Sequence, residues 1–341
     1  MFETIWFLLW GILWAIYFML DGFDLGLGTL MPFVSENDTD RRVVYNAMGP
    51  FWDGNEVWLI TAGGVTFAAF PTAYAVMFST LYTPLLIILF ALIIRGVSFE
   101  FRGAIDSAAW RTLWDTCLFI GSVVPALLFG VAFANIFQGI PFDAKHVFQG
   151  NLFTLLNPYG ILGGVLFMAL FLLHGCLWLA IKSEGSLLKR AGSTAPVLWV
   201  LLLLVAVLFL VFTWFATPLY ANYLNNPILF IIPLLAVVAL LATRVFIGKR
   251  EWWKAWFASC VTIFAAVMFG VIGLYPNLYP SSLDKNLSLN AFNAASSPLT
   301  LKIMLVVALI FVPVVIAYQA WAYHTFKDKV TDEFLASEEA Y

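Results

Sequence analysis

Apolar stretches of about twenty residues recur along the whole chain and are separated by short polar segments. A helix needs about 20 apolar residues to cross the hydrocarbon core of a bilayer. Inside lipid every backbone polar group must be satisfied within the protein, and separate stretches this long achieve that as helices. Charged residues make up 11% of the 341 residues, against about 25% in a soluble domain. The sequence therefore predicts an all-α polytopic membrane protein.

Nine stretches can be delimited, and we expect each to form a transmembrane helix within a single domain that covers residues 1–341. Their approximate bounds are 5–31, 52–71, 75–99, 113–137, 158–181, 196–217, 226–246, 254–275 and 299–325. The second stretch is the weakest of the nine, because it contains Asp53, Glu56 and a Gly-Gly pair and ends at Pro71.

The distribution of Lys and Arg orients these spans, because cytoplasmic loops are enriched in basic residues. With nine spans, 14 of the 17 basic residues fall on one side of the membrane and 3 on the other. If the second stretch does not cross, the split falls to 12 against 5. We therefore expect nine crossings, an N-terminus outside and a C-terminus in the cytoplasm.

Two carboxylates interrupt the first apolar stretch within the segment MLDGFDLGLG. Asp21 and Asp24 are three residues apart, which places them on the same face of a helix. Charges inside a bilayer are costly, so we expect this face to meet a partner helix or water and not lipid. Gly22 and Gly26 have the spacing that lets a neighbouring helix approach closely.

The segment FWDGNEVWLITAGG opens the second stretch with another pair of carboxylates three residues apart, Asp53 and Glu56. Asp53 has two interpretations at this cytoplasmic end. It caps its helix by accepting hydrogen bonds from first-turn N–H groups, or it is the acidic entry of a proton path. Glu56 is also compatible with an ordinary first-turn glutamate, and Asn55 is placed to extend hydrogen bonding into the span.

More charges gather near the same membrane face. Arg95 and Glu100 end the third stretch, and Arg111 and Asp115 open the fourth at helical spacing. These residues are placed to compensate the nearby acids, but ordinary ion pairs at the membrane interface are the preferred interpretation of both sets.

The residues alone predict no redox centre in this chain. His174 is the only histidine within a span, and an interior histidine with satisfied hydrogen bonds is preferred over a haem ligand. There is no nucleotide-binding motif, and no basic aromatic surface indicates a nucleic-acid partner. A secondary transporter or proton-coupled carrier, and a purely structural membrane scaffold, both remain open.

Several motifs, however, resemble subunit II of the cytochrome bd-type quinol oxidases. They are DGFDLGLG, NDTDRR, WDGNEVWLITAGG, RGVSFEFR, LNPYGILGG and YPNLYPSS. The resemblance covers essentially the whole chain and is weakest over residues 183–245. It implies a nine-helix protein of the bacterial cytoplasmic (inner) membrane. It also implies a heterodimer with subunit I, to which small single-helix subunits are candidate additions.

The resemblance further implies the reaction of the complex, which oxidises quinol and reduces oxygen to water with protons from the cytoplasm. Two b-type haems and one d-type haem would lie in subunit I. This chain would hold no haem or metal itself, while a structural quinone is a candidate ligand because some members of the family hold one.

The family motifs also assign roles residue by residue. The proton-path acid of the WDGN motif falls on Asp53, and the adjoining indole falls on Trp52. The two acids of the family's first helix fall on Asp21 and Asp24. The indole near an oxygen route proposed for some members falls on Trp58, where an anchoring or packing role is the simpler interpretation.

Overall fold

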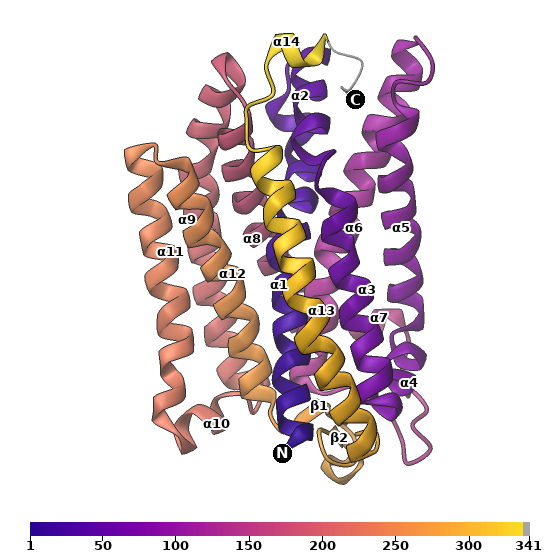
Figure 1. Ribbon diagram of the computed structural model, residues 1–341. Helices are drawn as coiled ribbons and strands as arrows, with labels where there is room; N and C mark the ends of the chain where they lie inside the picture. The colour runs from indigo at the N-terminus through magenta and orange to yellow at the C-terminus, as the bar shows by residue number, and fades with distance from the viewer. Residues whose placement is uncertain (337–341) are drawn as a thin grey trace.

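The computed structural model describes residues 1–336, nearly all of which lie in helices or short connections between them (Figure 1). The elements are α1 (Phe2–Val34), α2 (Asp38–Met48), α3 (Trp52–Ala69), α4 (Pro71–Thr80), α5 (Tyr82–Phe101), α6 (Ala108–Gln138), α7 (Leu152–Leu155), α8 (Pro158–Lys182), α9 (Gly185–Ala216), α10 (Tyr220–Asn225), η1 (Pro227–Phe230), α11 (Ile231–Lys249), α12 (Trp252–Leu274), β1 (Asn277–Tyr279), η2 (Lys285–Leu287), β2 (Leu289–Asn290), α13 (Pro298–Thr325) and α14 (Asp332–Leu335).

Eight helical segments in this described part are long and apolar enough to cross a membrane. They are α1, α5, α6, α8, α9, η1 with α11, α12 and α13. The chain is therefore an all-α polytopic membrane protein, as the sequence predicts.

The expected second span forms α3 but does not meet this length-and-composition criterion. Its 18 residues, which rise about 27 Å, are long enough, but they are not apolar enough, since the first turns contain Asp53, Asn55 and Glu56. Figure 1 shows α3 beside α1, and it places the N-terminus and α14 at opposite ends of the bundle. The ninth crossing and the orientation in the membrane stay predictions.

The expected span 75–99 is wrong as one helix, since α4 and α5 divide it at Leu81. Leu81 has non-helical dihedral angles, with φ −98° and ψ 19°. Pro84 follows in the first turn of α5, and its missing N–H cannot continue the hydrogen-bond ladder from α4. Another boundary differs as well, because α9 begins at Gly185, well before the expected residue 196.

The segments that join α6 to α8 and α12 to α13 meet at the end of the bundle that carries the N-terminus. The N–H of Ile140 donates to the carbonyl of Pro280 at 2.9 Å, and the N–H of Ser282 donates to the carbonyl of Ile140 at 3.0 Å. A two-stranded antiparallel sheet of β1 and β2 lies beside this contact. These connections therefore form one packed layer.

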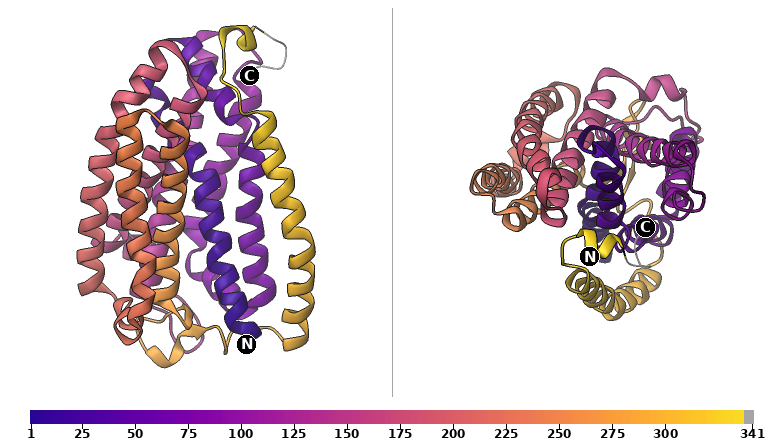
Figure 2. Two further views of the ribbon diagram at one scale, coloured as in Figure 1. Left: turned by 60° about the vertical axis from the view of Figure 1, so that its left-hand side comes forward. Right: turned by 90° about the horizontal axis from the view of Figure 1, so that it is seen from above.

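Helix α1 lies near the middle of the bundle, and α13 lies at its edge (Figure 2). The close approach predicted from Gly22 and Gly26 is confirmed. A side chain added at Gly22 would meet the ring of Phe171 on α8, and one added at Gly26 would overlap the backbone of Phe171. The two glycines thus let α8 lie directly against the acid-bearing helix.

Candidate functional site: a buried acidic cluster between α1, α3 and α5

The two acids of α1 lie inside the protein. Asp21 is 0% exposed and Asp24 is 1% exposed. Asp24 accepts a hydrogen bond of 2.7 Å from the side-chain amide of Asn55 on α3. As expected, both carboxylates face neighbouring helices.

Arg95 of α5 connects α1 to α3. Its Nη2 lies 2.7 Å from Oδ1 of Asp21 and 2.6 Å from Oε1 of Glu56. Because the guanidinium is 1% exposed, it is buried, and the predicted ordinary interface ion pair is wrong for this residue. Glu100 is exposed and makes no hydrogen bond or ion pair with the described residues. Of Arg95 and Glu100, only Arg95 therefore takes part in the buried cluster, where it is the cation that compensates the acids.

The cluster is rich in negative groups. It holds three carboxyl groups and one guanidinium: Asp21 and Glu56 pair with Arg95, and Asp24, one turn from Asp21, is bonded by Asn55. Among the described residues, no partner is found for Oδ2 of Asp21, Oδ1 of Asp24, and Nε and Nη1 of Arg95. Buried polar atoms in proteins nearly always have partners. The cluster therefore has hydrogen-bonding capacity that its own side chains do not use.

The start of α3 lies beside this cluster. Trp52 stacks on Phe99 of α5, with ring centroids 5.0 Å apart and planes 6° apart. Asp53 is exposed and makes no hydrogen bond or ion pair within the described part of the chain. Phe51 occupies the N-cap position of α3, and no side-chain hydrogen bond caps the helix there. The capping interpretation of Asp53 is therefore wrong, and its carboxylate is unengaged within this chain.

Helix α13 covers the other side of α3 with two polar residues that the sequence analysis missed. The hydroxyl of Tyr323 donates to Oδ1 of Asn55 at 3.0 Å. The indole N–H of Trp58 donates to Oε1 of Gln319 at 2.8 Å. Trp58 is 3% exposed, which agrees with the packing interpretation. The signal that could have revealed them is a pair of polar side chains four residues apart in an otherwise apolar span.

Asp115 belongs to a separate network at the end of the bundle that carries α2. It pairs with Nε of Arg102 at 2.7 Å and with Nη1 of Arg41 at 3.0 Å. Arg111 pairs with Asp106 at 2.9 Å. The Arg111–Asp115 pair expected from helical spacing is thus wrong. Asp115 pairs instead with Arg41 of α2 and with Arg102 at the end of α5.

His174 on α8 is buried with both ring nitrogens engaged. One nitrogen lies 3.0 Å from the hydroxyl of Ser259, and the other lies 2.9 Å from the carbonyl of Met19. This arrangement agrees with the interior-histidine interpretation. In the described residues, no three His, Cys, Asp or Glu side chains are grouped so that they could hold a metal ion.

Comparisons with known proteins agree over nearly the full length. A family model described as cytochrome bd terminal oxidase subunit II matches residues 2–326. Cytochrome bd-I ubiquinol oxidase subunit 2 of Escherichia coli (strain K12) is 37% identical, covering 97% of this chain and 96% of the relative. Cytochrome bd ubiquinol oxidase subunit 2 of Bacillus subtilis (strain 168) is 36% identical, covering 96% and 97%. In fold, the chain is similar to the bd oxidase structure from Geobacillus thermodenitrificans, with a TM-score of 0.77, 17% identity and coverage of 95% and 98%.

Proposed function

The chain belongs to the cytochrome bd terminal oxidase subunit II family, and from that premise we propose that it stabilises the haem-bearing subunit I and passes cytoplasmic protons towards it. As a member of this family it is one component of an oxidoreductase complex in the bacterial inner membrane. The curated relatives are named as ubiquinol oxidases, so quinol and oxygen are the substrates that we propose for the complex. Family membership does not favour the alternative of a transporter.

The haems of the proposed complex do not fit this chain. His174, the one histidine in the middle of a span, uses both ring nitrogens in hydrogen bonds, and His324 lies in the last turn of α13. We therefore assign the two b-type haems and the d-type haem to subunit I. The contributions that we propose for this chain are then assembly, the handling of protons and oxygen access.

The face that we propose for subunit I runs along α3 and α13. Asp53 is exposed in the isolated chain, and an unpaired carboxylate facing lipid is costly. Beside it, a Cβ built on Gly54 meets no atom within 4 Å, so another helix could approach closely here. Only 6% of the most apolar window of α13 is buried within this chain. A protein partner would cover both helices and remove the carboxylate from lipid.

The proton path that we propose begins at Asp53 and continues through the buried cluster. Asp53 is exposed, and Glu56 follows three residues later on the same helix face. Glu56 and Asp21 accept charge-assisted hydrogen bonds of 2.6 Å and 2.7 Å from Arg95, so the guanidinium, which cannot give up its own proton, holds these two proton-carrying carboxyl groups on the same nitrogen. Because a low-dielectric environment disfavours surplus negative charge, a cluster of three carboxyl groups and one guanidinium favours holding a proton. The excess of acids is the single observation that carries this proposal.

The experiment replaces Asp53 with Asn in the assembled complex. We expect quinol oxidation to slow severalfold while haem content and assembly stay unchanged, because the amide keeps the shape but cannot carry the proton. Glu100→Gln is the matched control, since Glu100 is an exposed, unpaired acid at the end of α5, and it should leave turnover unchanged. Unaltered turnover in Asp53→Asn at equal haem content would remove Asp53 from the path.

Oxygen access is a second role, which we propose for the neighbourhood of Trp58. The next two residues of α3, Leu59 and Ile60, line an apolar cavity. Trp58→Ala would then change the apparent affinity of the complex for oxygen without loss of haem. An unchanged oxygen affinity would leave Trp58 a packing residue.

A further inference from the structure

Asn55 of α3 links the acidic cluster to α13 through both ends of its side-chain amide. Its Nδ2 donates to Oδ2 of Asp24 at 2.7 Å and to the carbonyl of Leu20 at 3.3 Å. Its Oδ1 accepts from the hydroxyl of Tyr323 at 3.0 Å and from Nε2 of Gln319 at 3.5 Å. Since a side-chain amide has two N–H donors and one oxygen with two lone pairs, these contacts use all of its hydrogen-bonding capacity.

The partners of Asn55 fix the direction in which its amide points. Asn55 is 0% exposed, so the amide depends on partners within the protein. The carbonyl of Leu20 can only accept, and a flipped amide would place its oxygen against this second acceptor. On the other side, the hydroxyl of Tyr323 donates to the amide oxygen and favours the same orientation. The amide is therefore held with its N–H groups towards Asp24.

Contacts on two sides hold Tyr323 at this position. The centroid of its ring lies 4.6 Å from that of Phe51, the N-cap residue of α3. The end of α13 is anchored as well, because Nζ of the buried Lys182 on α8 donates to the carbonyl of Phe326 and, at 3.2 Å, to that of Asp328. A side chain locked in this way can hold its hydrogen-bond partner within a narrow range of geometry. The fold thus places the hydroxyl of Tyr323 independently of the hydrogen bond that it makes.

We propose that Tyr323 is a positioning residue for Asp24 and acts through the amide of Asn55. This inference rests on the proposed role of the buried cluster in carrying protons. A donor on the amide oxygen polarises the amide, and hydrogen bonds joined in such a chain strengthen one another. Tyr323 therefore strengthens the hydrogen bond that Asn55 donates to Asp24, and it keeps that carboxyl group in one orientation for proton transfer.

The experiment observes Asp24 directly in the intact complex, which is prepared with aspartate labelled with ¹³C at the side-chain carboxyl carbon. In the oxidised-minus-reduced infrared difference spectrum, the isotope-sensitive band that disappears in Asp24→Glu belongs to Asp24. The stretching frequency of a carboxyl or carboxylate group depends on its hydrogen bonds, so this band reports the contact with Asn55 in either protonation state. We expect the band to shift in Tyr323→Phe, which keeps the aromatic packing and removes only the donor. It should shift further in Asn55→Leu, which removes the hydrogen bond to Asp24 itself.

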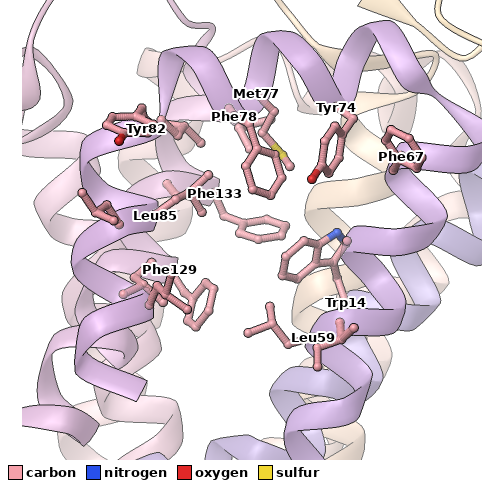
Figure 3. A pocket seen from close by; sticks show the side chains of 18 of the residues that line it. Trp14, Leu59, Phe67, Tyr74, Met77, Phe78, Tyr82, Leu85, Phe129 and Phe133 are labelled. Atoms are coloured by element: carbon pink, nitrogen blue, oxygen red, sulfur yellow. The ribbon is translucent and has the colours of Figure 1, made fainter. Parts of the chain in front are cut away.

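Two other tyrosines provide matched controls. The hydroxyl of Tyr159 on α8 makes a buried hydrogen bond of 2.8 Å with that of Thr213 on α9, so Tyr159→Phe loses a comparable contact outside the cluster. Tyr74 lines the apolar cavity between α1, α3, α4, α5 and α6 (Figure 3), and its hydroxyl makes no hydrogen bond with the described residues. Both control variants should keep the Asp24 band and the turnover of the parent. In Tyr323→Phe, turnover should fall roughly two- to tenfold at equal haem content, the range that loss of one hydrogen bond produces.

The infrared band and the turnover distinguish failure of this proposal from failure of the proton path. A band that is unchanged in Tyr323→Phe, or that shifts equally in Tyr159→Phe, overturns the positioning role even where Asp53→Asn slows turnover. A band that shifts in Tyr323→Phe at unchanged turnover supports the positioning role and removes Asp24 from the step that limits the rate. A parent spectrum without an Asp24 band overturns the proposal, since this carboxyl group would then take no part in proton transfer linked to the reaction.

Discussion

Helices α8 and α13 are both apolar enough to cross a membrane, but their positions in the bundle are opposite. In the most apolar 18-residue stretch of α8, 83% of the residues are buried, against 6% in the corresponding stretch of α13. Within α13 only Leu301 is classed as buried. Apolar composition therefore predicts that a helix enters the membrane, but it does not predict whether protein or lipid surrounds that helix.

Small residues account for much of the difference. A Cβ on Gly175 of α8 would overlap the backbone of α1 near Leu27, as one on Gly26 would overlap α8. The sequence of α13 contains no glycine, and its polar side chains reach α3 through Gln319 and Tyr323. Close backbone packing holds α8 in the centre, whereas α13 is attached by a few polar contacts and keeps a large face for a partner.

The largest expected effect comes from Gly26→Leu. Overpacking costs about 1–3 kcal/mol where neighbouring side chains can shift, but here the obstacle is the backbone of Phe171. We expect no assembled complex, measured as haem-containing protein after gel filtration. The control is Gly103→Leu, at a position where a Cβ meets nothing within 4 Å. Normal assembly of Gly26→Leu would show that the α1–α8 contact is not what fixes α8 in the core.

Arg95→Leu should have the next largest effect. It removes the cation between α1, α3 and α5 and leaves Asp21 and Glu56 without their charge partner. Breaking a buried pair in this way costs about 3–5 kcal/mol. We expect a clearly lower Tm of the purified complex.

Two further variants test the cause of that loss. Arg111→Leu breaks a partly exposed ion pair and should cost at most about 1 kcal/mol. The double variant Arg95→Leu, Asp21→Leu should recover part of the lost Tm, because the buried charge left behind is removed as well. A double variant no more stable than Arg95→Leu would indicate that packing of Arg95, and not charge, matters.

The sequence predicted what depends on local periodicity. Spacing along one helix is enough to place Asp21 with Asp24, and Gly22 with Gly26, on shared faces. Family motifs identified the correct protein class and pointed to the start of α3. Both kinds of inference need no knowledge of which helices are neighbours.

Pairing between distant helices was beyond the sequence. Arg95 binds acids from two other helices, and Asp115 prefers cations that are distant in sequence over Arg111 one turn away. Such choices depend on how helices pack, which local spacing does not encode. The break at Leu81 could have been found, because Pro84 cannot continue a helix from α4.

A smaller effect is expected from Trp58→Phe, which tests how α13 is attached. The variant keeps an aromatic ring in a buried position but loses the hydrogen bond to Gln319. We expect a loss of about 1 kcal/mol, seen as a modest fall in Tm. A double-mutant cycle with Gln319→Leu isolates the contact, since the losses of stability from the two single variants should not add in the double variant. Fully additive losses would mean that this hydrogen bond does not hold α13 to α3.

The smallest effect concerns the loop between α6 and α7, which extends the comparison from α8 to the segment that leads into it. The carboxylate of Asp143 accepts hydrogen bonds from the N–H groups of Val147 at 3.0 Å and Lys145 at 2.8 Å, and from the side chain of Gln149 at 2.9 Å. The backbone hydrogen bond from Val147 is the main cause that lowers the pKa of Asp143 below its ordinary value, followed by the contacts from Lys145 and Gln149. Local hydrogen bonds, and not close helix packing, therefore hold the tip of this loop, residues 143–149.

Because the pKa of Asp143 is lower in the folded loop than in the unfolded chain, its stabilisation is complete above the unfolded value of about 4. It is lost as the pH falls through the folded pKa. We expect the amides of Lys145 and Val147 to lose protection from hydrogen exchange over this acidic range, after correction for the intrinsic exchange rate, while α8 stays protected. Asp143→Asn should weaken protection at neutral pH and remove its dependence on pH. If protection in Asp143→Asn still fell on acidification, another group would have to hold the loop, and the contrast between a locally bonded connection and a packed core helix would lose its support.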